Sequence, residues 1–416
     1  MKKRVVITGL GVVAGDHSNV DDFWNDVVLG KSFVKKINLE NPNILCKIGA
    51  TVNNFEIDDS LLKRKEQKRT DKTIHWALHS VNQAKIQSGL DKVEMNMFRV
   101  GNLVGTGFGG FMSLVKHHEK YTMDKKIASF PAYSLTQSLN NMIPAYISIK
   151  NNLKGVSYSI SSACASSAHA FEVAFNEIQN GTHDVIYCTG VESTINDVGI
   201  LNFVNLRALT CDFNEDPKKA SRPFDKDRSG FVMGEGSATL ILEDYEHAKK
   251  RGAKILAEVV STASTSDAKY LVAPDESSQP IIECMNLALE KGNLKPEEID
   301  YVNAHATSTI IGDQFESKGI ESVFKNNKKL SISATKSITG HLLGGAGALE
   351  LLISIMAMNT GKIPPTINLD EADKDCNLDY TAHKFKEKEI NYILKNSFGF
   401  GGTNCSIILK KFKEDK

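Results

Sequence analysis

The sequence predicts an α/β fold, because short β-rich apolar runs alternate along its 416 residues with segments of helical periodicity. The runs expected to form strands are residues 5–7, 100–104, 156–160, 185–189, 238–242, 255–260, 301–304, 330–333, 379–381 and 407–409. Apolar residues follow helical spacing at 166–180, 280–291 and 346–359. This alternation favours largely parallel or mixed sheets.

The length and the charge of the chain limit its function classes. A chain of 416 residues is expected to hold two or three domain-sized units, or two fused halves with a seam near residues 249–254. Lysine and arginine total 50, as do aspartate and glutamate, so the net charge is zero. Neither nucleic acid nor a membrane is therefore an expected partner, and any basic contact surface must be local.

The N-terminus and the cysteines bear on the compartment. The segment MKKRVVITGLGVV resembles the start of a signal peptide, but its apolar run is short and interrupted by glycine, so we interpret it as the first strand. No uninterrupted apolar stretch reaches the roughly 18–20 residues that span a bilayer. The seven cysteines are scattered without a CxxC pair, which argues against a disulfide framework or a zinc site. We expect a cytoplasmic protein without a metal.

A basic segment, LLKRKEQKRTDK, occupies residues 61–72. Runs of charge usually form a solvated helix face, which is one interpretation of this segment. The other interpretation is a docking surface for an acidic partner. The residues alone leave both open.

Cys164 is the candidate nucleophile. It lies between the expected strand 156–160 and the helical segment 166–180, so it occupies a strand-to-helix turn. The free N–H groups and the dipole at a helix start favour an anion, and we therefore expect a lowered thiol pKa. The alternative is a buried inert cysteine. We adopt that alternative for the other six, which are Cys46, Cys188, Cys211, Cys284, Cys376 and Cys405.

Two histidines have unusual surroundings. His305 follows an expected strand and precedes three hydroxyl residues, and His341 lies in a glycine-rich turn before the segment 346–359. Strand-end histidines beside a glycine-rich helix start are typical of active sites in α/β proteins. A satisfied core histidine and a packing turn are the alternatives. Lys336 and Glu350 flank His341 and could orient the site or form a buried ion pair.

A glycine-dense segment, NSFGFGGTN, covers residues 396–404 and is expected to be a loop before the last strand. It resembles a phosphate-binding loop but lacks the G-K-[ST] ending and the strand–GxGxxG–helix context. Such a loop can instead bring a backbone N–H close to a substrate oxyanion.

Six segments together carry a family resemblance: VVITGLGVV, SSACASSAHA, RPFDKDRSGFVMGEG, NAHATST, TKSITGHLLGGAG and NSFGFGGTN. In this order and at these spacings they resemble the β-ketoacyl-acyl carrier protein (ACP) synthases of the KAS I/II type. These belong to the thiolase-like superfamily, which includes the type II polyketide ketosynthases. The resemblance implies two similar halves in a layered α-β-α-β-α architecture. Residues 1–253 would hold Cys164, and residues 254–416 would hold His305 and His341.

The resemblance also implies roles for individual residues. Cys164 matches the acyl-accepting nucleophile, and His305 and His341 match the histidines that bind the malonyl thioester and assist its decarboxylation. Lys336 matches the lysine that orders the site, and Glu350 matches the helix carboxylate beside it.

Further residues match the parts of the family site that hold the substrate. Phe400 matches the gating aromatic, and its N–H would form an oxyanion hole with that of Cys164. Thr307 and Thr309 match the threonines that bind the phosphopantetheine arm. The expected ACP-docking residues are Lys63, Arg64, Lys65, Lys68, Arg69 and Arg207.

The implied reaction is acyl transfer to Cys164, decarboxylation of malonyl-ACP and attack of the enolate on the thioester. No cofactor is expected, since both substrates are carried on ACP phosphopantetheine. The family forms dimers, so a homodimer or a heterodimer with a homologous subunit is expected. The competing functions are a non-catalytic partner like the chain-length factors, which lack the nucleophile, and a thiolase-type enzyme. His341 disfavours the latter.

The chain departs from the family pattern near the expected substrate channel. The substituted positions are Ala306 (usually glycine), Ser229 (usually aspartate), Ile310 (usually proline), Tyr270 and Val272 (usually more polar). Phe108 matches a position that faces the acyl pocket and often carries a smaller side chain. A phenyl ring there predicts a preference for short or unusual acyl chains, unless the pocket bends elsewhere.

Overall fold

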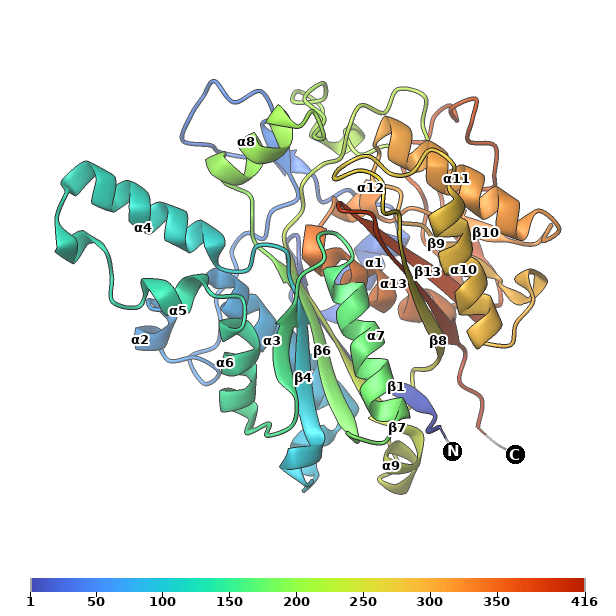
Figure 1. Cartoon of the computed structure of the whole chain (residues 1–416), viewed down its shortest axis with the longest axis horizontal. Coiled ribbons are helices and arrows are strands. Elements are labelled where there is room, and N and C mark those ends of the chain that lie inside the picture. Colours follow the sequence, from blue (N-terminus) through green and yellow to red (C-terminus); the bar gives the residue numbers. More distant parts are fainter. Residues whose placement is uncertain (1, 415–416) are drawn as a thin grey trace.

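Ten strands form one continuous mixed sheet in the computed structural model, which describes residues 2–414 (Figure 1). The first five are β1 (Val5–Ala14), β4 (Val100–Gly105), β5 (Ser157–Ile160), β6 (Val185–Glu192) and β7 (Gly236–Asp244). The second five are β8 (Ala257–Ser266), β9 (Tyr301–Asn303), β10 (Ser331–Ser333), β13 (Tyr392–Gly399) and β14 (Thr403–Lys410). Two short ladders lie outside the sheet: β2 (Lys35–Lys36) with β3 (Ile48–Gly49), and β11 (Lys362–Ile363) with β12 (Lys386–Glu387).

The two sets of five strands have the same topology. Their spatial orders are β5-β4-β6-β7-β1 and β10-β9-β13-β14-β8, so each set runs third, second, fourth, fifth, first in chain order. Parallel and antiparallel pairings occur at equivalent places in both sets. Three antiparallel residue pairs between β1 and β8 join them. The chain is therefore an internal duplication, which no repeated sequence pattern indicated.

Helices cover both faces of the sheet. They are α1 (Val20–Val28), α2 (Arg64–Gln67), α3 (Lys72–Ser88), α4 (Phe111–Asp124), α5 (Ser134–Ser138), α6 (Met142–Asn151), α7 (Ser166–Gln179), α8 (Asp197–Asn205), α9 (Tyr245–Lys250), α10 (Gln279–Lys291), α11 (Ile310–Phe324), α12 (Lys336–Thr339) and α13 (Ala346–Thr360). The helices α7 and α13 pack against each other, and both contact strands of the two sets. They form the central layer.

The alternation of side chains along the strands shows the layers. In β6, Val185 and Tyr187 belong to a core shared with α3, whereas Ile186 and Cys188 belong to the core around α7 and α13. In the second set, Val302 faces the core under α10 and α11, whereas Tyr301 faces the central core. The layers are therefore α-β-α-β-α, as predicted.

Two predictions at the C-terminal end were wrong. Residues 379–381 form no strand, because only an isolated bridge between Thr366 and Ala382 lies there. The segment 396–404 is a β-hairpin rather than a loop, since β13 and β14 run through it up to a turn at residues 400–402. Gly401 and Gly402 take positive φ angles of 83° and 69° in that turn, which glycine adopts without strain.

One helical stretch, Leu343–Thr360, is long and apolar enough to cross a membrane by length and composition alone. In the fold it is the central-layer helix α13 with the turn before it, and 83% of it is buried. A core helix passes the same test, so this stretch gives only weak evidence for a membrane span.

Candidate active site

Cys164 lies in a sharp turn between β5 and α7. Ala163 before it has a φ of 50°, which a non-glycine residue keeps only where its surroundings hold it. The Ser166 hydroxyl supports this turn, since it accepts from the Ser162 N–H at 2.9 Å and donates to the Ala163 carbonyl at 2.7 Å. The turn places Cys164 in the wall of a cavity of about 420 Å³.

Residues from both halves line this cavity. Of the residues singled out in the sequence, the cavity brings together Cys164, Arg207, His305, Thr307, Thr309, His341 and Phe400. The ring centroids of His305 and His341 are 5.4 Å apart, with an interplanar angle of 82°. His305 lies just after the parallel strand β9, and Cys164 lies just after the parallel strand β5, so the carboxyl ends of parallel strands from the two halves supply these two groups.

Hydrogen bonding and burial together set the protonation states of the two histidines. The Lys336 ammonium donates to His305 Nδ1 at 3.3 Å and to the His305 carbonyl at 2.6 Å. An ammonium can only donate, so Nδ1 is an acceptor and the ring proton resides on Nε2. Neither ring nitrogen of His341 has a partner among the described residues. Burial, reinforced by the charge of Lys336, lowers the pKa of both imidazoles well below the usual range, and both are neutral at pH 7.

A buried group of three charges lies behind the histidines. Lys336 forms a short ion pair with Glu350, and the second oxygen of Glu350 lies 2.9 Å from Nζ of Lys395. All three side chains are almost completely buried. Two ammonium groups thus share one carboxylate.

The prediction of a lowered Cys164 pKa was wrong. The pKa of the thiol is raised to about 12, mainly by burial and to a smaller extent by the carboxylates Glu192 and Glu350. The charge of Lys336 and a hydrogen bond from the Phe400 N–H lower it only partly. The helix start by itself favours the thiolate, but the buried surroundings of the sulfur have the larger effect on its pKa.

Phe400 lies at the turn of the β13–β14 hairpin, and its backbone N–H bonds the Cys164 sulfur. The Thr403 hydroxyl donates to the Ser162 carbonyl at 3.1 Å and so fixes the hairpin against the Cys164 turn. The Phe400 ring, half-buried in the cavity, lies 6.4 Å from that of Phe203. The hairpin turn therefore presents the Phe400 N–H to the sulfur and the Phe400 ring to the cavity.

Two carboxylates hold the loop that carries the histidine and the threonines. Glu316 accepts the N–H groups of His305 at 2.8 Å and Ala306 at 2.6 Å. Asp313 accepts the Ser308 N–H at 3.1 Å. Burial raises the pKa of Glu316 to about 7 and that of Asp313 to about 6. Thr307 and Thr309 themselves are linked, hydroxyl to hydroxyl, at 3.1 Å.

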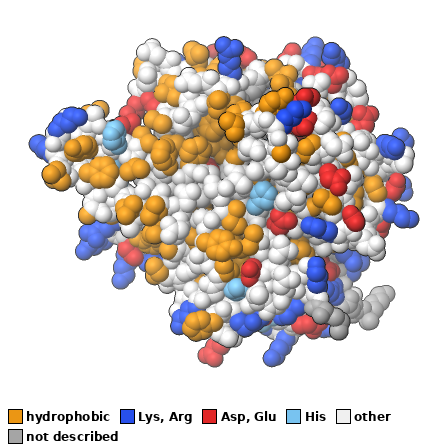
Figure 2. All heavy atoms as spheres, in the orientation of Figure 1, with side chains coloured by type: hydrophobic (Ala, Val, Ile, Leu, Met, Phe, Trp, Pro, Cys, Tyr) orange, Lys and Arg blue, Asp and Glu red, His pale blue; other side chains and the backbone are white. Residues whose placement is uncertain are grey.

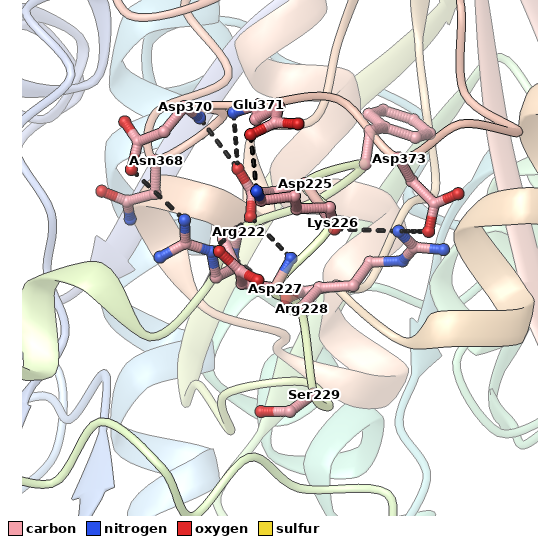
Figure 3. Close-up of polar contacts among 12 residues, drawn as sticks. Arg222, Asp225, Lys226, Asp227, Arg228, Ser229, Asn368, Asp370, Glu371 and Asp373 are labelled. Carbon is pink, nitrogen blue, oxygen red and sulfur yellow. Dashed lines mark hydrogen bonds and ion pairs between the residues drawn. The ribbon is translucent and has the colours of Figure 1, made fainter.

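Arg228 supports the same loop from the other side. Its guanidinium donates to the Thr309 carbonyl at 3.0 Å and to the Ile310 carbonyl at 2.5 Å. The same group donates to Asp373 at 2.8 Å and to the Asp225 carbonyl at 2.9 Å (Figure 3). An arginine that is 3% exposed thereby fixes one wall of the cavity.

Sequence reasoning missed several residues of this site. They are Glu192, Arg228, Asp313, Glu316 and Lys395. The signal for Asp313 and Glu316 was an acidic pair at helical spacing directly after the NAHATST segment. Glu192 ends a buried strand and accepts the N–H groups of Gly107 at 2.7 Å and Gly344 at 3.1 Å. Lys395 directly follows the apolar residues Ile393 and Leu394, and a charge next to such residues is itself the signal.

Phe108 does not itself line the cavity. Its ring centroid lies 6.2 Å from that of Phe203, which does line it. Phe108 thus packs behind the cavity wall, next to Phe111 at 6.4 Å. Its expected effect on chain length would pass through Phe203 and stays a prediction.

The basic residues do not all lie together. Arg207 is exposed at the cavity, whereas the 63–69 segment around α2 lies elsewhere on the molecule, near α5 and α6 (Figure 1). The segment is solvent-exposed at Lys63, Arg64, Lys65, Lys68 and Arg69. Within it Arg64 forms an ion pair with Asp59 at 3.0 Å. This exposure fits both a solvated helix face and a docking surface for an acidic partner.

Four of the five departures from the family pattern line the cavity, and Tyr270 does not. Ser229 lies apart from the ion pairs of its own segment (Figure 3) and shares a hydrogen bond of 2.7 Å with Thr210. Ala306 is buried beside Glu316, and Ile310 is exposed at the cavity. Val272 also lines the cavity.

One group of metal-ligand types occurs among the described residues, His169, Glu172 and Cys405, whose ligand atoms lie within 4.8 Å of one another. His169 already bonds Ser162 at 2.7 Å, and Glu172 accepts from Thr262 at 3.2 Å. These three side chains lie outside the cavity lining.

Comparisons with known proteins agree with this arrangement. The family model "Beta-ketoacyl synthase, N-terminal domain" matches residues 2–248, and "Beta-ketoacyl synthase, C-terminal domain" matches residues 256–370. The chain is 39% identical to 3-oxoacyl-[acyl-carrier-protein] synthase 2 of Coxiella burnetii, over 99% of both chains.

Solved structures show the same fold. A type II polyketide ketosynthase, solved with its acyl-carrier protein and bound to the hexaketide, superposes with a TM-score of 0.92 at 28% identity, over 99% of this chain and 100% of that one. The ishigamide ketosynthase/chain length factor superposes with a TM-score of 0.90 at 26% identity, over 99% and 100%. Because both family models match the chain and the synthase of Coxiella burnetii is 39% identical over 99% of both chains, the chain belongs to the β-ketoacyl synthase family.

Proposed function

We propose that the protein is an elongating β-ketoacyl-ACP synthase that lengthens an acyl chain held on Cys164. One observation carries this proposal: Cys164, the Phe400 N–H and two neutral imidazoles meet at a single cavity. A thiol beside a backbone donor suits acyl transfer, and two ring N–H groups suit an enolate.

The first step is acyl transfer from ACP. The Cys164 sulfur attacks the thioester carbonyl, and the N–H groups of Phe400 and Cys164 bond the oxyanion. Because the thiol pKa is raised, its proton leaves during attack, and the departing phosphopantetheine sulfur receives it. The step exchanges one thioester for another, and needs no further reactant.

The second step is decarboxylation of malonyl-ACP. The bond to the carboxylate breaks, CO2 leaves, and the electron pair forms an enolate on the thioester. His305 Nε2–H, fixed by the Lys336 bond to Nδ1, donates to the developing oxygen. His341, whose ring nitrogens are free of protein partners among the described residues, donates beside it.

The third step forms the carbon–carbon bond. The enolate carbon attacks the Cys164 thioester, the tetrahedral intermediate collapses, and the Cys164 sulfur leaves and takes up a proton. The product is β-ketoacyl-ACP. Thr307 and Thr309, on the cavity wall, hold the phosphopantetheine arm, and Lys336 and Glu350 keep His305 oriented.

The test is condensation of an acyl-ACP with malonyl-ACP, compared between wild type and Cys164→Ala. The wild type should release CO2 and form β-ketoacyl-ACP, and the variant should form none. Equal condensation by both proteins would refute the proposal. Decarboxylation of malonyl-ACP without any condensation would favour a chain-length-factor-like partner instead, and cleavage of β-ketoacyl-CoA by the wild type would favour a thiolase-type enzyme.

Phe108 bears on the acyl chain. Its ring packs behind Phe203, which lines the cavity, and through Phe203 it would restrict the space for a long alkyl tail. We expect C4–C8 acyl-ACP to be extended faster than C14–C16, and Phe108→Ala to narrow this difference. Competition assays with mixed acyl-ACPs measure it. Equal rates of extension for the short and the long acyl chains by the wild type would contradict this preference. A preference for short chains favours a specialised polyketide pathway over housekeeping fatty-acid synthesis.

The partners follow from the same function. ACP brings both substrates, and the exposed basic residues at 63–69 and Arg207 suit its acidic surface. The solved polyketide ketosynthase with its ACP supports this partner. We expect the reaction to use no cofactor besides the carrier's phosphopantetheine, and we expect the protein to act in the cytoplasm.

A second subunit would cover the edge of the sheet at β5. This strand ends the ten-stranded order and is partly exposed. The arm formed by α4 and α5 projects beside it (Figure 1), and hydrophobic side chains gather on the arm in Figure 2. On the arm Met123 is 83% exposed and Ile127 is 88% exposed. An open edge beside an apolar arm suits a homodimer, or a heterodimer with a homologous subunit.

A further inference from the structure

Lys395 is a buried cation that the steps above do not use. It lies in the middle of β13, between β9 and β14, and is 0% exposed. Its neighbours Ile393 and Leu394 belong to hydrophobic cores. An ammonium group in such a place is strongly disfavoured unless it is paired, so its partners explain its presence.

The partners of Lys395 connect it to the catalytic histidines. Its Nζ lies 2.9 Å from Glu350 Oε2 and bonds the Ser397 hydroxyl. The other oxygen of Glu350 pairs with Lys336, and Lys336 donates to Nδ1 of His305. One continuous set of contacts thus runs from β13 through α13 and α12 to the loop after β9.

We propose that Lys395 is a positioning residue: its ammonium fixes Glu350, so that Lys336 stays aimed at His305 Nδ1, and it places a second positive charge behind the histidine pair. This inference rests on the proposed function for its kinetic consequence, but its structural part does not. With Lys395 present the group of three carries a net positive charge, which favours the negative enolate over the neutral ground state of the thioester carbonyl.

The electrostatic surroundings of the two imidazoles agree with this role. The charged or titratable groups around them are Lys336 from α12, Lys395 from β13, Glu350 from α13, Glu316 from α11 and the Cys164 thiol. After burial, the positive charges of Lys336 and Lys395 are causes that lower the pKa of both histidines. Removal of Lys395 should therefore raise both pKa values.

The first measurement needs no substrate. Lys395→Met keeps the length of the side chain and removes its charge, and Lys388→Met is the matched control. Lys388 is only half-buried; its ammonium donates to the Asp300 carbonyl at 2.7 Å and does not contact Glu350. In protein labelled at histidine Cε1, NMR titration should show higher His305 and His341 pKa values in Lys395→Met and unchanged values in Lys388→Met. Unchanged values in Lys395→Met would overturn the proposal.

The second measurement separates the steps of catalysis. In Lys395→Met the decarboxylation of malonyl-ACP should fall about 10- to 100-fold, less than the roughly 100- to 1000-fold loss when an oxyanion donor itself is removed. Acylation of Cys164 by acyl-ACP should stay within about twofold, because the Phe400 N–H does not depend on Lys395. An equal decrease in the rates of decarboxylation and of Cys164 acylation would indicate a merely structural role and overturn the proposal.

A third variant covers the case in which Lys395→Met does not fold. Lys395→Ala leaves room for a small amine, and added methylammonium should restore decarboxylation at least about fivefold, whereas tetramethylammonium, which has no N–H donor, should not. Full activity of Lys395→Ala without an amine would overturn the proposal. A wild type that fails to condense would contradict the proposed function alone, since the histidine titration would still decide the position of Lys395.

Discussion

At Cys164 the local backbone and the burial of the side chain act on the thiol in opposite directions. The helix start and the Phe400 N–H favour the anion, yet burial dominates and raises the pKa to about 12. The imidazoles beside it are held neutral, again mainly by burial. The cavity wall at these three side chains thus carries no charge before the substrate binds, and fixed donors act on charge only as it develops.

The neutral state of His341 predicts a pH dependence of stability. The pKa of His341 is lowered in the folded protein, whereas in the unfolded chain it is about 6.5. Below pH 6.5 the unfolded chain therefore takes up a proton that the folded protein does not, and the folded state loses stability as the pH falls. In His341→Asn this loss is absent. Below pH 6.5 the variant should gain stability relative to the wild type by roughly 1.4 kcal/mol per pH unit, until the folded pKa is reached.

Urea unfolding of both proteins at pH 7, 6 and 5 measures this difference. Glu192 and Glu316, whose pKa values burial raises to about 7, act in the opposite direction, but they are present in both proteins and cancel. A difference in unfolding free energy that does not change with pH would show that His341 is protonated in the folded state.

The residues that sequence patterns identified and those they missed differ in a physical way. Cys164, His305 and His341 could be predicted because each stands in a short motif at the end of a strand or the start of a helix. The Lys336–Glu350 pair was also expected, as one of two alternatives, and the structure brings the two together. Lys395 could not be paired with Glu350 from the sequence, because strand register and helix packing decide which distant residues meet. The prediction of a lowered Cys164 pKa was wrong for the same reason, because the burial of a side chain depends on the tertiary structure.

At the scale of elements, the functional loops are fixed by bonds to backbone groups. Glu316 and Asp313 hold the loop after β9 from α11, Arg228 holds it from the opposite side, and Glu192 holds the loop after β4. The strand and helix patterns located nine of the ten sheet strands and the helices α7, α10 and α13, whereas the other helices were not predicted. The hairpin at 396–404 was missed because its buried Asn396 and Ser397 are polar, and such residues enter a strand core only when hydrogen bonds satisfy them.

The loop held by Arg228 gives the prediction at this scale. Arg228→Lys keeps the charge but cannot reach the Thr309 and Ile310 carbonyls and Asp373 together. The cavity wall with Thr309 should then loosen, and KM for malonyl-ACP should rise about tenfold, the equivalent of about 1.4 kcal/mol, with a smaller change in kcat. Steady-state kinetics measure this split.

The control for this prediction is Lys226→Met. Lys226 belongs to the same segment, but its ion pair with Glu371 is exposed (Figure 3), and such pairs contribute little. Its kinetics should match those of the wild type. A kcat loss larger than the KM change in Arg228→Lys would mean that Arg228 acts on the chemical step rather than on carrier binding.

At the scale of the whole molecule, the duplication explains where the site lies. Each half has the same strand order, and each contributes groups from the carboxyl ends of its parallel strands. The two central helices α7 and α13 follow the corresponding strands β5 and β10 and pack together. The fold class could be predicted from the alternation of strands and helices. The two similar halves were expected only from the family resemblance, because the halves keep no visible common sequence. A boundary at 253/254 stays a prediction.

The free edge of the sheet gives the last prediction. The carbonyls of Val156 and Ile160 accept from β4, so the alternate residues Ser157 and Ser159 direct their backbone groups away from it. A second subunit related by a two-fold axis can pair with these groups. Ser159→Pro removes one outward N–H and should convert the wild-type dimer to a monomer in analytical ultracentrifugation.

The matched control is Ser159→Ala, which keeps the N–H and loses only the hydroxyl bond to the Asn140 carbonyl. It should stay dimeric, so that the change in assembly is assigned to the backbone donor and not to the side chain. A wild type that is monomeric alone but dimeric with a homologous subunit would identify the heterodimer, and Ser159→Pro should then prevent that assembly. Dimers of unchanged affinity in Ser159→Pro would place the interface away from β5, because pairing across this edge requires the backbone donors that proline lacks.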